Sequence, residues 1–512
     1  MGYKTIIIKL PAEYDEDILK EEISKVLQIK KFIYNIDNKS LDARNKKNIH
    51  WLLRINIISD ELKGGDPPVS EKLNIPYKKH KEKVLVIGSG PAGFFCALTL
   101  LKAGFDVTIL ERGSEVDKRE KAVINFEKSG IFNTSNNYCF GEGGAGTFSD
   151  GKLTSRSKYI SCERNFIIEN YIKAGAPDEI KYLAHPHLGT DNLKKIVVNL
   201  RNQFINDGGK IFFDTKVEDI EIIDNVATRI FTTKGIIDFD AIFIASGNSA
   251  YDTYKILINR GIMFRTKNFA VGTRMEHIQE IINMAQWGKK IIKGIKAAEY
   301  RLTSEGDGKH HVYSFCMCPG GIVVPAMAFE YTGIVNGMSY YNRDGIYANA
   351  ACVASVHPDE LAGYAVSAYD ALNILENFER KFYAFSNSYK APACTIKEFI
   401  NKRLINETFT SSYPLSTIKA PLWNLLPDVI VDAITKGLIE FSKKIKGFEN
   451  GILLGFESKT SSPIQVVRDE KGLCSGFENI YVVGEGSGYA GGIISSASDG
   501  IKIAMRFIYS KY

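Results

Sequence analysis

The feature that most constrains the fold is a strand–turn–helix–strand unit at residues 83–113. Its sequence, KVLVIGSGPAGFFCALTLLKAGFDVTILERG, runs from an apolar strand through a glycine-rich turn and an apolar helix to a second strand. A βαβ unit of about 30 residues is the building block of parallel sheets that are covered by helices. The sequence therefore predicts an α/β fold with a Rossmann-like domain.

The turn of this unit has the GxGxxG pattern of dinucleotide-binding loops. Its residues are Gly88, Ser89, Gly90, Pro91, Ala92 and Gly93. The first glycine makes the tight turn, the second lets the backbone approach a pyrophosphate, and the third lets the helix pack closely on the strand. The helix N-terminus offers free N–H groups and a partial positive charge to the phosphates. The same pattern at 141–146 and 486–491 lacks a compact βαβ context with a downstream acid, so only the first match predicts a dinucleotide site.

The acid at the end of the second strand restricts which dinucleotide can bind. Glu111 lies 18 residues after Gly93, and Arg112 follows it. A carboxylate at this place accepts hydrogen bonds from the ribose hydroxyls and repels a 2′-phosphate. The motif therefore argues against NADP and leaves FAD and NAD open.

Two distant segments resemble the cofactor-binding elements of two-dinucleotide-binding flavoproteins. Ala245-Ser246-Gly247 ends an apolar strand, as Ala-Thr-Gly does in those proteins, and Gly484-Glu485 stands where they have Gly-Asp. The resemblance implies that Glu485 holds the ribityl chain. It also implies that the helix beginning at Gly492 and Ile493 directs N–H groups at the flavin N1–C2 carbonyl. Both elements favour FAD over NAD.

Seven segments spread along the whole chain are similar to the bacterial uncharacterised FAD-dependent dehydrogenases, often labelled NAD(FAD)-utilising. They are SLDARNK (40–46), GEGGAGTFSDGKL (141–153), KNFAVGTRMEH (267–277), YSFCMCPGG (313–321), NGMS (336–339), ESKTSSP (457–463) and GEGSGYAGGI (484–493). The resemblance implies bound FAD, the two-dinucleotide-binding fold and an oxidoreductase activity, with no particular substrate.

Four positions depart from the pattern of that family. Asn248 and Tyr251 stand where His and Arg are usual, Lys459 replaces an arginine, and Ile278 replaces a proline. A change from arginine to lysine removes bidentate recognition of a carboxylate or phosphate. Altered substrate contacts are therefore expected.

The order of apolar segments along the chain and the shifts in composition predict five parts. Residues 1–63 are expected to form a small ferredoxin-like α+β module, because a strand, a helix and two further strands follow one another. Residues 64–82, rich in Pro, Gly and charge, are expected to be a linker. The FAD-binding domain is predicted over 83–264 and 446–512, with an α+β substrate or cap domain inserted at 265–445.

The segment GEGGAGTFSDGKL is the strongest candidate for a second cofactor contact. It carries five glycines between Gly141 and Gly151, a density that indicates close backbone approach to another group. Gly144, Thr147 and Lys152 are expected near the isoalloxazine or the pyrophosphate, and a surface turn is the alternative. Val217, which lies within the strand-like segment KIFFDTKVEDIEIID (210–224), completes the expected cofactor contacts.

The catalytic candidates lie in the predicted inserted domain. Cys316 and Cys318 form a C-x-C pair, which on a strand would place both thiols on one face. They are interpreted either as redox-active thiols or as small residues packed in the core. His277 is a candidate proton donor and Arg274 a candidate anion clamp near the flavin N5, with hydrogen bonding between domains as the alternative.

Two further groups of basic side chains carry weaker predictions. His185 and His187 are not expected to bind a metal, because no second ligand cluster has metal-site spacing. Arg44, Lys46 and Lys47 are expected to lie on a solvated face, with contact to RNA, to a protein partner or to the flavin domain as the alternatives. No metal site is predicted.

The composition limits the classes of partner. The chain has 512 residues and a net charge of +6, a small excess that argues against DNA and RNA as ligands. No apolar run is long enough to span a membrane, and the N-terminus turns acidic after three isoleucines, which predicts no signal peptide. The eight cysteines are then expected to be reduced in the cytoplasm.

The sequence thus predicts an FAD-dependent oxidoreductase of unknown small-molecule substrate, with a protein redox partner as one option. Any nicotinamide, NADH or NADPH, would bind only transiently, because no second strand–GxGxxG–helix unit forms a dedicated domain for it. A flavin-dependent RNA-modifying enzyme and a non-catalytic flavin-binding redox sensor remain the alternatives.

Overall fold

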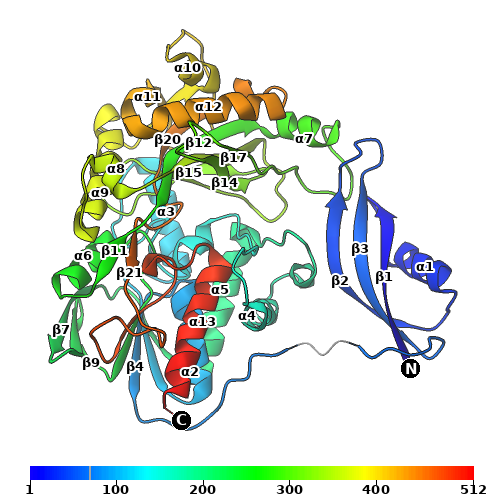
Figure 1. The fold of residues 1–512 in the computed structure, drawn as a ribbon, viewed down its shortest axis with the longest axis horizontal. Helices are drawn as coiled ribbons and strands as arrows, with labels where there is room; N and C mark the ends of the chain where they lie inside the picture. The colour runs from blue at the N-terminus through cyan, green and yellow to red at the C-terminus, as the bar shows by residue number, and fades with distance from the viewer. Residues whose placement is uncertain (68–70, 512) are drawn as a thin grey trace.

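The computed structural model describes residues 1–67 and 71–511, which form two stacked layers and a small module at one side (Figure 1). The lower layer holds a parallel sheet with the long helices α2 (Pro91–Ala103) and α13 (Ile493–Tyr509). The upper layer holds a larger sheet with the helices α9 (Ala368–Ser386) and α12 (Asp428–Lys444). This mixed α/β architecture confirms the predicted fold class.

The N-terminal module is a three-stranded antiparallel sheet with one helix. Its elements are β1 (Gly2–Pro11), α1 (Glu16–Leu27), β2 (Ile33–Asp42) and β3 (His50–Ser59), and the strand order is β1-β3-β2. Alternate residues of β1, among them Ile6 and Ile8, are buried in one cluster with Leu19 and Ile23 of the helix, as expected for a half-buried strand. The order matches the first half of a ferredoxin-like fold. No second helix and fourth strand follow in 60–67 or 71–82, so the prediction holds for that half alone.

The module reaches the rest of the molecule through β2. The N–H of Lys39 donates a hydrogen bond to the carbonyl of Tyr182 (2.7 Å), and the N–H of Ala184 donates to the carbonyl of Lys39 (2.9 Å). These bonds hold the module beside the segment that precedes His185. Residues 68–70 of the predicted linker lie outside the described part of the chain, and 71–82 contain no helix or strand.

The three basic residues of the module are all exposed, as predicted, and one of them also contacts the upper layer. Lys46 donates from Nζ to the carbonyl of Ala285 in the upper layer (2.6 Å). Arg44 is exposed and forms an ion pair with Asp42, and Lys47 is exposed. One of the three predicted surface cations therefore helps to dock the module.

The lower sheet is parallel and is built from distant parts of the chain. Its strands, in the order β22-β10-β4-β5-β6, are β22 (Ile480–Val482), β10 (Ala241–Ile244), β4 (Lys83–Ile87), β5 (Asp106–Leu110) and β6 (Lys210–Phe212). Their side chains alternate between two buried clusters, one with α2 and α13 and the other with the meander β7 (Val217–Ile223), β8 (Val226–Thr232) and β9 (Gly235–Asp238). Burial on both faces explains the nearly continuous apolar sequence of these strands.

Small residues allow the two long helices of the lower layer to touch. A Cβ atom on Gly500 of α13 would lie 2.3 Å from the carbonyl oxygen of Ala92 in α2. This contact fixes the C-terminal helix against the helix that follows the GxGxxG turn. Both helices therefore begin near the same edge of the sheet (Figure 1).

The upper sheet has seven strands in the order β13-β14-β17-β12-β20-β18-β19. They are β13 (Thr303–Ser304), β14 (Val312–Cys318), β17 (Tyr347–Val356), β12 (Phe269–Ile278), β20 (Ile452–Glu457), β18 (Ala391–Thr395) and β19 (Thr417–Lys419). One face packs on α9 and α12 through a cluster that contains Met275, Leu375 and Phe441. The shorter helices of this layer are α7 (Gln279–Trp287), α8 (Pro358–Ala362), α10 (Ile396–Asn401) and α11 (Leu422–Leu425).

The predicted end of the inserted domain at residue 445 is wrong. Strand β20 pairs with β12 and β18, so the chain stays in the upper sheet until Glu457. The chain leaves the upper sheet for the lower layer at β21 (Ile464–Val466), which pairs with β11 (Phe264–Thr266). All six residues of β20 are buried, and a uniformly apolar strand carries no periodicity that could tell the two sheets apart.

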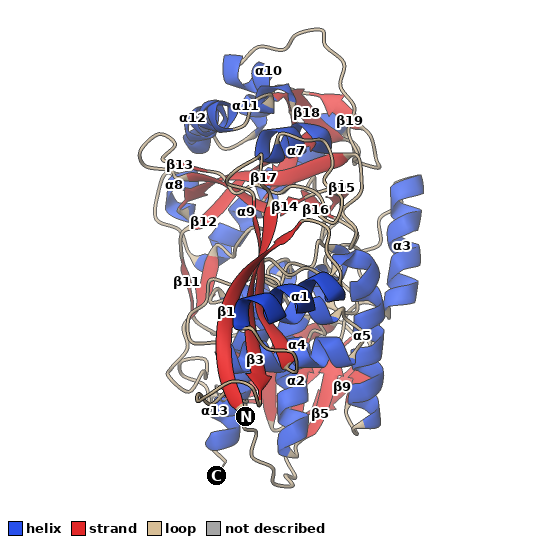
Figure 2. Ribbon diagram, turned by 90° about the vertical axis from the view of Figure 1, so that its right-hand side faces the viewer, coloured by secondary structure: helices blue, strands red, loops and turns tan. Residues whose placement is uncertain are grey.

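Four helices and a two-stranded sheet complete the fold (Figure 2). They are α3 (Val116–Ser129), α4 (Ser161–Lys173), α5 (Gly189–Asn206), α6 (Tyr251–Asn259), and β15 (Ile322–Pro325) paired with β16 (Val335–Met338). Within residues 1–67 and 71–511, none of the helices combines the length and the apolar character needed to cross a bilayer.

Candidate active site

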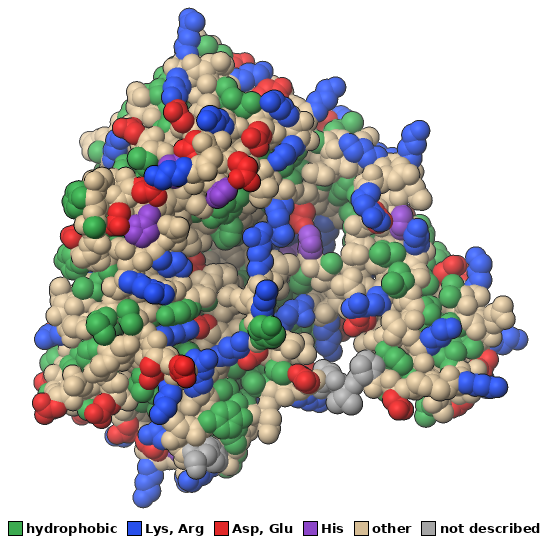
Figure 3. Space-filling model, in the orientation of Figure 1, with side chains coloured by type: hydrophobic (Ala, Val, Ile, Leu, Met, Phe, Trp, Pro, Cys, Tyr) green, Lys and Arg blue, Asp and Glu red, His purple; other side chains and the backbone are tan. Residues whose placement is uncertain are grey.

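A cavity of about 1500 Å³ lies between the two layers. Its walls come from the carboxyl ends of β4, β5 and β10, from the loop 144–157, from the segment 485–496, and from β14 of the upper sheet. The space-filling view shows a hollow at the middle of the molecule, with Lys and Arg side chains at its edge (Figure 3). Pockets for single ligands have about 300–1,000 Å³, so this cavity can hold a large ligand together with a smaller one.

The fold requires glycine at two of the three positions of the GxGxxG turn, and at the third, Gly90, the side-chain position is open. Gly88 has φ +103°, which favours glycine. A Cβ atom on Gly93 would lie 2.0 Å from the carbonyl oxygen of Gly88, so this residue lets α2 pack on β4. A Cβ atom on Gly90 would meet no protein atom closer than the Cα atom of Gly144, at 3.7 Å, and Gly90 lines the cavity. The open side of Gly90 is therefore where a ligand can approach the backbone.

Arg119 organises the glycine-rich loop from beneath. Its buried guanidinium donates hydrogen bonds to four carbonyl groups at 2.8–3.0 Å, those of Asn137, Tyr138, Glu142 and Gly144. Burial lowers the pKa of Arg119 to about 10, which leaves the group charged at neutral pH. Arg119 belongs to no motif, and the sequence analysis did not select it.

Glu111 is held by the protein at both carboxylate oxygens. Oε2 accepts hydrogen bonds from the N–H and the hydroxyl of Ser89 (2.9 and 2.8 Å), and Oε1 accepts from the N–H groups of Gly113 and Gly141 (3.0 and 3.1 Å). A carboxylate offers about four acceptor sites, so these donors are enough to fill them. Glu111 therefore ties the turn to the glycine-rich loop, and its contact with a ribose stays a prediction.

Arg112 extends the same wall with a fixed positive charge. Its guanidinium binds both carboxylate oxygens of Asp252 (3.0 and 3.1 Å) and lies 4.1 Å from the centre of the Phe140 ring. Val217 and Thr215 line the cavity in the same lower wall. The sequence analysis selected Arg112 and Val217 but missed Thr215.

Two polar side chains of this wall lack partners within the described part of the molecule. The hydroxyl of Ser246 and the amide nitrogen of Asn248 are buried and make no hydrogen bond, and both residues line the cavity. Gly247, between them, has φ +77°. Buried polar groups are normally hydrogen-bonded, so these atoms are expected to meet a polar ligand.

Thr147 does not contribute to the cavity as predicted. It is 1% exposed, and its hydroxyl donates to the carbonyl of Glu142 (3.1 Å). Its own carbonyl accepts from the hydroxyl of Thr190 (2.9 Å). The reason is the tight turn of the loop, which exposes Gly144 and Gly146 to the cavity and folds Thr147 behind them.

The C-terminal segment lines the cavity beside the glycine-rich loop, since a Cβ atom on Gly146 would lie 3.4 Å from the side chain of Ile493. A Cβ atom on Gly484 would lie 2.5 Å from the Cβ atom of Ala92, so the segment rests on the start of α2. Gly492, with φ +76°, is the N-cap of α13, and Ile493 begins that helix. Gly492, Ile493 and Glu485 all line the cavity, which places the positive end of the helix dipole there.

The pKa of the Glu485 carboxyl group is strongly raised. Burial raises the pKa of Glu485 to about 7, although a hydrogen bond from the backbone of Gly492 acts in the opposite direction. Near neutral pH the group can therefore donate or accept a proton. The predicted role on the ribityl chain is compatible with either form.

The raised pKa of Glu485 predicts a pH-dependent stability of the ligand-free protein. Between its ordinary value of 4.5 and about 7, the folded protein binds more protons than the unfolded chain. The contribution of Glu485 to stability is present below this window and is lost as the pH rises through it. We expect Glu485→Gln to show a smaller loss of Tm between about pH 5 and about pH 8 than the wild type.

Thermal melts of the ligand-free wild type, of Glu485→Gln and of Glu470→Gln at both pH values test this expectation. Glu470 is exposed and serves as the matched control. Equal pH dependence in the wild type and Glu485→Gln would contradict the assignment.

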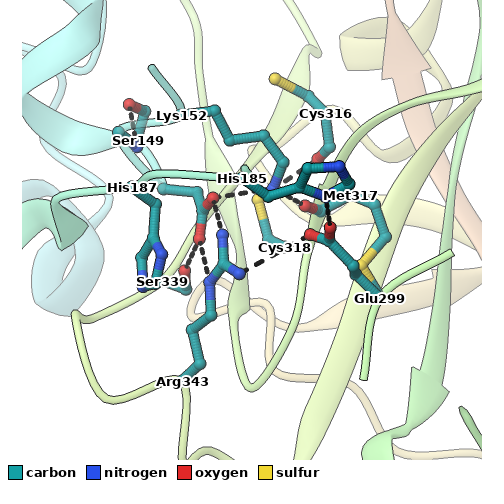
Figure 4. A network of polar contacts seen from close by, with 12 residues as sticks. Ser149, Lys152, His185, His187, Glu299, Cys316, Met317, Cys318, Ser339 and Arg343 are labelled. Carbon is teal, nitrogen blue, oxygen red and sulfur yellow. Dashed lines mark hydrogen bonds and ion pairs between the residues drawn. The ribbon is translucent and has the colours of Figure 1, made fainter. Parts of the chain in front are cut away.

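The far wall contains a network of alternating charges (Figure 4). Asp150 accepts hydrogen bonds from Nζ of Lys152 (2.7 Å), from Nε of Arg343 (3.0 Å) and from the hydroxyl of Ser339. Burial alone would raise the pKa of Asp150, but Lys152 and Arg343 lower it well below its usual range. Lys152 also donates to the carbonyl of Met317. The predicted contact Lys152 thus lines the cavity as part of an ion-paired cluster.

His185 and Glu299 extend the network into the open part of the cavity. Nδ1 of His185 contacts Oε1 of Glu299, whose Oε2 lies 3.6 Å from Nη1 of Arg343. Burial would raise the pKa of Glu299, but His185 and the cations Lys152 and Arg343 lower it to about 2. Nε2 of His185 makes no hydrogen bond to any residue that the structure describes. The sequence analysis considered His185 only as a metal ligand and missed this pair.

His187 plays a different part from its neighbour. Its Nε2 lies 3.0 Å from the carbonyl oxygen of Tyr341, and burial lowers its pKa to about 4. The two histidines therefore do not converge. Among residues 1–67 and 71–511, no cluster of three or more His, Cys, Asp or Glu side chains could hold a metal ion.

The two cysteines of the C-x-C pair point to opposite sides. A bulge between Phe315 and Cys318, with φ +45° at Cys316, breaks the alternation of β14. Cys316 is exposed to the cavity, whereas Cys318 is 1% exposed and its Sγ lies 3.7 Å from Nη2 of Arg274 (Figure 4). Both thiols are free, and desolvation raises the pKa of each. The expectation that they share one face is wrong because of the bulge.

Arg274 is not a free anion clamp. It is fully buried, and Nη1 forms an ion pair with Glu457 (2.9 Å). Nε donates to Asn349 (2.8 Å), and Nη2 donates to the carbonyl of Cys316 (2.9 Å). Arg274 therefore holds the bulge that presents Cys316.

His277 is not in the cavity, and its prediction as a proton donor is wrong. It is 2% exposed, its Nε2 lies 2.8 Å from the carbonyl oxygen of Phe448, and burial lowers its pKa to about 4. The cause is strand alternation: His277 shares the face of β12 that carries Met275 toward the helices of the upper layer. Arg274 lies on the opposite face.

Two of the departures from the family pattern contact one another. The hydroxyl of Tyr251 (3.0 Å) and Nζ of Lys459 (2.8 Å) both donate to Oε1 of buried Glu379, and Nζ of Lys459 lies 3.6 Å from the centre of the Tyr251 ring. Asn248 and Lys459 line the cavity. Ile278 is 41% exposed and begins α7, away from them. The substitutions at 251 and 459 are therefore coupled through Glu379.

Comparisons with known proteins agree with this site. A family model for an FAD binding domain matches residues 81–129, and one described as "FAD-dependent protein, C-terminal domain-like" matches residues 268–460. A protein of Clostridium beijerinckii described as "Uncharacterized protein" is 38% identical over 527 aligned residues, which cover 98% of this chain and 97% of that protein.

Solved structures share part of the architecture at low similarity. Glycine oxidase from Bacillus cereus covers 84% of this chain and 96% of its own at 13% identity and a TM-score of 0.34. L-proline dehydrogenase from P. horikoshii covers 84% and 93% at 14% identity and a TM-score of 0.34. CtdE in complex with FAD covers 82% of each chain at 11% identity and a TM-score of 0.34.

The family of the chain is shown by the relative, which spans nearly the whole chain, and by the two family models, which match one layer each. The GxGxxG turn, the open side of Gly90 and the unpartnered polar atoms in the wall suit FAD. The chain therefore belongs to a family of FAD-dependent proteins.

Proposed function

We propose that the protein transfers hydride or electrons between a small-molecule substrate and non-covalently bound FAD in the cavity between the layers. One observation carries the proposal: the GxGxxG turn and the N-terminus of α13 line one continuous cavity. An extended FAD would place its ADP moiety on Gly88–Gly93 and its flavin against Glu485, Gly492 and Ile493. When bound, FAD supplies the redox chemistry, and the protein supplies binding, orientation and proton handling.

The ADP end would be held mainly by backbone groups. Gly90 leaves room for the pyrophosphate, and the first N–H groups of α2 face it with the positive end of the helix dipole. Ser246 and Asn248 offer their unpartnered polar atoms from the adjoining wall. Glu111 keeps the turn and the glycine-rich loop in place through its four hydrogen bonds.

We infer that His185 handles the substrate proton in place of the predicted His277. Oxidation of an alcohol or amine moves a hydride from C–H to the flavin and releases one proton from O–H or N–H, and a base must take that proton. His185 lines the cavity with a free Nε2, and the ionised Glu299 orients the ring through Nδ1. This arrangement is the base-plus-orienting-carboxylate pattern of general acid–base sites.

Replacement of His185 by glutamine is expected to slow substrate oxidation about 10²- to 10⁴-fold, the usual contribution of a general base. FAD content should stay unchanged. The rate of flavin bleaching by an alcohol or amine donor in anaerobic stopped flow checks this expectation. His311→Gln is the matched control, since His311 also lines the cavity but is bound to Glu305 (3.1 Å). Equal rates in the two variants would rule out the assignment.

Cys316 and Cys318 are not expected to exchange electrons with the flavin as a disulfide pair. Disulfide exchange with the flavin needs two thiols that can meet, and Cys318 points away from Cys316 toward Arg274. Cys316 alone remains as a contact of the flavin or the substrate. The free state of all eight cysteines suits the proposed cytoplasmic location.

An anaerobic visible-absorbance titration of the FAD-loaded protein with NADH and then NADPH tests the choice of electron donor. Stoichiometric bleaching would identify a nicotinamide-driven reductase with a transient nicotinamide site. A flavin that stays oxidised with both, and bleaches with an organic donor, would identify a substrate dehydrogenase. A flavin that no donor reduces would favour the redox sensor and contradict the proposal.

A further inference from the structure

Seven lysine and arginine side chains line the cavity, and most are already engaged. They are Arg112, Lys152, Arg156, Arg301, Arg343, Lys444 and Lys459. Arg112, Lys152, Arg343 and Lys459 form ion pairs with carboxylates, and Nζ of Lys444 donates to the carbonyl of Thr303 (2.6 Å). Within the described residues, Arg156 and Arg301 form no hydrogen bond and no ion pair.

These two guanidinium groups border the same short hairpin of the upper sheet. Arg301 precedes β13 by two residues, and Thr303 of β13 pairs with Tyr313 of β14. Burial raises the pKa of Tyr313, and the neighbouring Arg156 acts in the opposite direction, which places its charge close to that ring. Lys444 reaches the same hairpin through Thr303. Three cations from distant segments therefore line the cavity near this hairpin.

The carboxylates on this side do not neutralise the two arginines. Glu305 binds Nδ1 of His311 (3.1 Å). Glu440 lies one turn before Lys444 on α12, a spacing at which their side chains can interact, and it forms no ion pair with either arginine in the described part of the chain. The hydroxyl groups of Ser155 and Thr303 also line this part of the wall. This side of the cavity is thus rich in hydrogen-bond donors, and among the described residues the guanidinium groups of Arg156 and Arg301 have no partner.

The phosphates of FAD do not account for these arginines. In the proposed function the pyrophosphate lies at Gly88–Gly93, at the carboxyl end of β4 in the lower sheet. Arg156 and Arg301 belong to the wall around β13 and β14 of the upper sheet. They therefore remain available to a second ligand, for which the cavity volume of about 1500 Å³ leaves room.

We propose that Arg156 and Arg301 form an anion site that binds a carboxylate or phosphate group of the substrate. The inference rests on the proposed function, because it places this ligand beside bound FAD. Guanidinium groups match both acids in geometry and form strong charge-assisted hydrogen bonds with them. The substrate class is accordingly a small organic acid or phosphate ester. A macromolecular polyanion is disfavoured, because only two free cations lie here and the net charge is only +6.

The test is a titration of the FAD-loaded protein with succinate and, separately, with inorganic pyrophosphate at constant ionic strength. We expect at least one of them to perturb the flavin absorbance spectrum in a saturable manner, and the neutral analogue succinamide to have no effect. Arg156→Gln and Arg301→Gln are each expected to weaken binding about tenfold, which corresponds to the loss of one charge-assisted hydrogen bond. Arg506→Gln, at an exposed position on α13 outside the cavity, should bind as the wild type does.

Each outcome decides the inference separately from the proposed function. Saturable binding of succinate or of pyrophosphate that both cavity variants weaken supports the site and names the acid. Binding by neither anion, or equal binding by the variants, overturns it while the flavin spectrum still reports bound FAD. Binding only to an RNA of tens of nucleotides, with a steep salt dependence, would also overturn it. A protein that does not retain FAD would instead refute the proposed function.

Discussion

Replacement of Gly90 by valine is expected to abolish FAD binding and leave the protein folded. Gly90 has φ −67° and ψ 177°, a conformation open to any residue, and a Cβ atom would lie 3.7 Å from its nearest protein neighbour. The added side chain would instead occupy the space in which a pyrophosphate approaches the backbone. We expect the affinity for FAD to fall about 100-fold or more, equivalent to about 2.7 kcal/mol.

Flavin absorbance of the purified variant and its melting temperature without FAD measure the two effects separately. Gly90→Ala should show a smaller loss of affinity, because one methyl group intrudes less. Gly93→Ala provides the contrast: its Cβ atom would lie 2.0 Å from the carbonyl oxygen of Gly88, so the fold itself should lose stability. A Gly90→Val protein that retains FAD would show that the dinucleotide lies elsewhere.

Replacement of Arg274 by methionine is expected to cost about 3–5 kcal/mol of stability, the usual penalty for leaving one member of a buried ion pair alone. Arg274 is fully buried, and its partner Glu457 is 1% exposed. Burial raises the pKa of Glu457, and Arg274 opposes this shift. Without the arginine, the acid must either take up a proton or remain charged in a region without water.

The midpoint of urea unfolding measures this loss, and two further variants control for it. The double variant Arg274→Met/Glu457→Leu should be more stable than Arg274→Met, because removing both charges avoids the lone buried carboxylate. Arg260→Met removes a comparable pair with Asp219 at the surface, where the two side chains are 46% and 35% exposed. It should cost no more than about 1 kcal/mol. Equal losses in Arg274→Met and Arg260→Met would contradict the role of burial.

The parallel sheet could be predicted from the sequence because its strands carry distinct signals. Strands β4 and β5 lie inside the predicted unit 83–113, and β10 ends directly before Ala245, where an apolar strand is predicted to end. The turn at Gly88–Gly93 could also be predicted, since three glycines with separate steric roles leave few alternative conformations. These features are local, and local sequence determines them.

The parts that could not be predicted depend on which face of a strand turns inward. His277 and Arg274 are three residues apart on β12, so alternation places them on opposite faces, and the sequence does not say which face meets the cavity. The bulge at Cys316 shifts the register of β14, and no glycine or proline marks it. A one-residue shift exchanges the faces, so the sequence could not show that His277 and Cys318 lie away from the cavity whereas Cys316 lines it.

Contacts between segments far apart in the sequence could not be predicted either. His185 and Glu299 lie 114 residues apart, in loops that no motif marks, and meet only because the two layers stack. Arg119 and Glu379 gather groups from several segments without any recognisable pattern around them. In each case the arrangement follows from the tertiary fold rather than from local sequence.

The most direct test of the account is to identify the flavin released from the purified protein after heat or acid denaturation. We predict a yellow protein that releases FAD into the supernatant at close to one equivalent per chain, and a colourless protein when Gly90 is replaced by valine. Flavin that stays with the precipitated chain would show covalent attachment and contradict the proposed binding mode. A wild-type protein without flavin, which cannot be reconstituted with FAD, would contradict the assignment of the cavity.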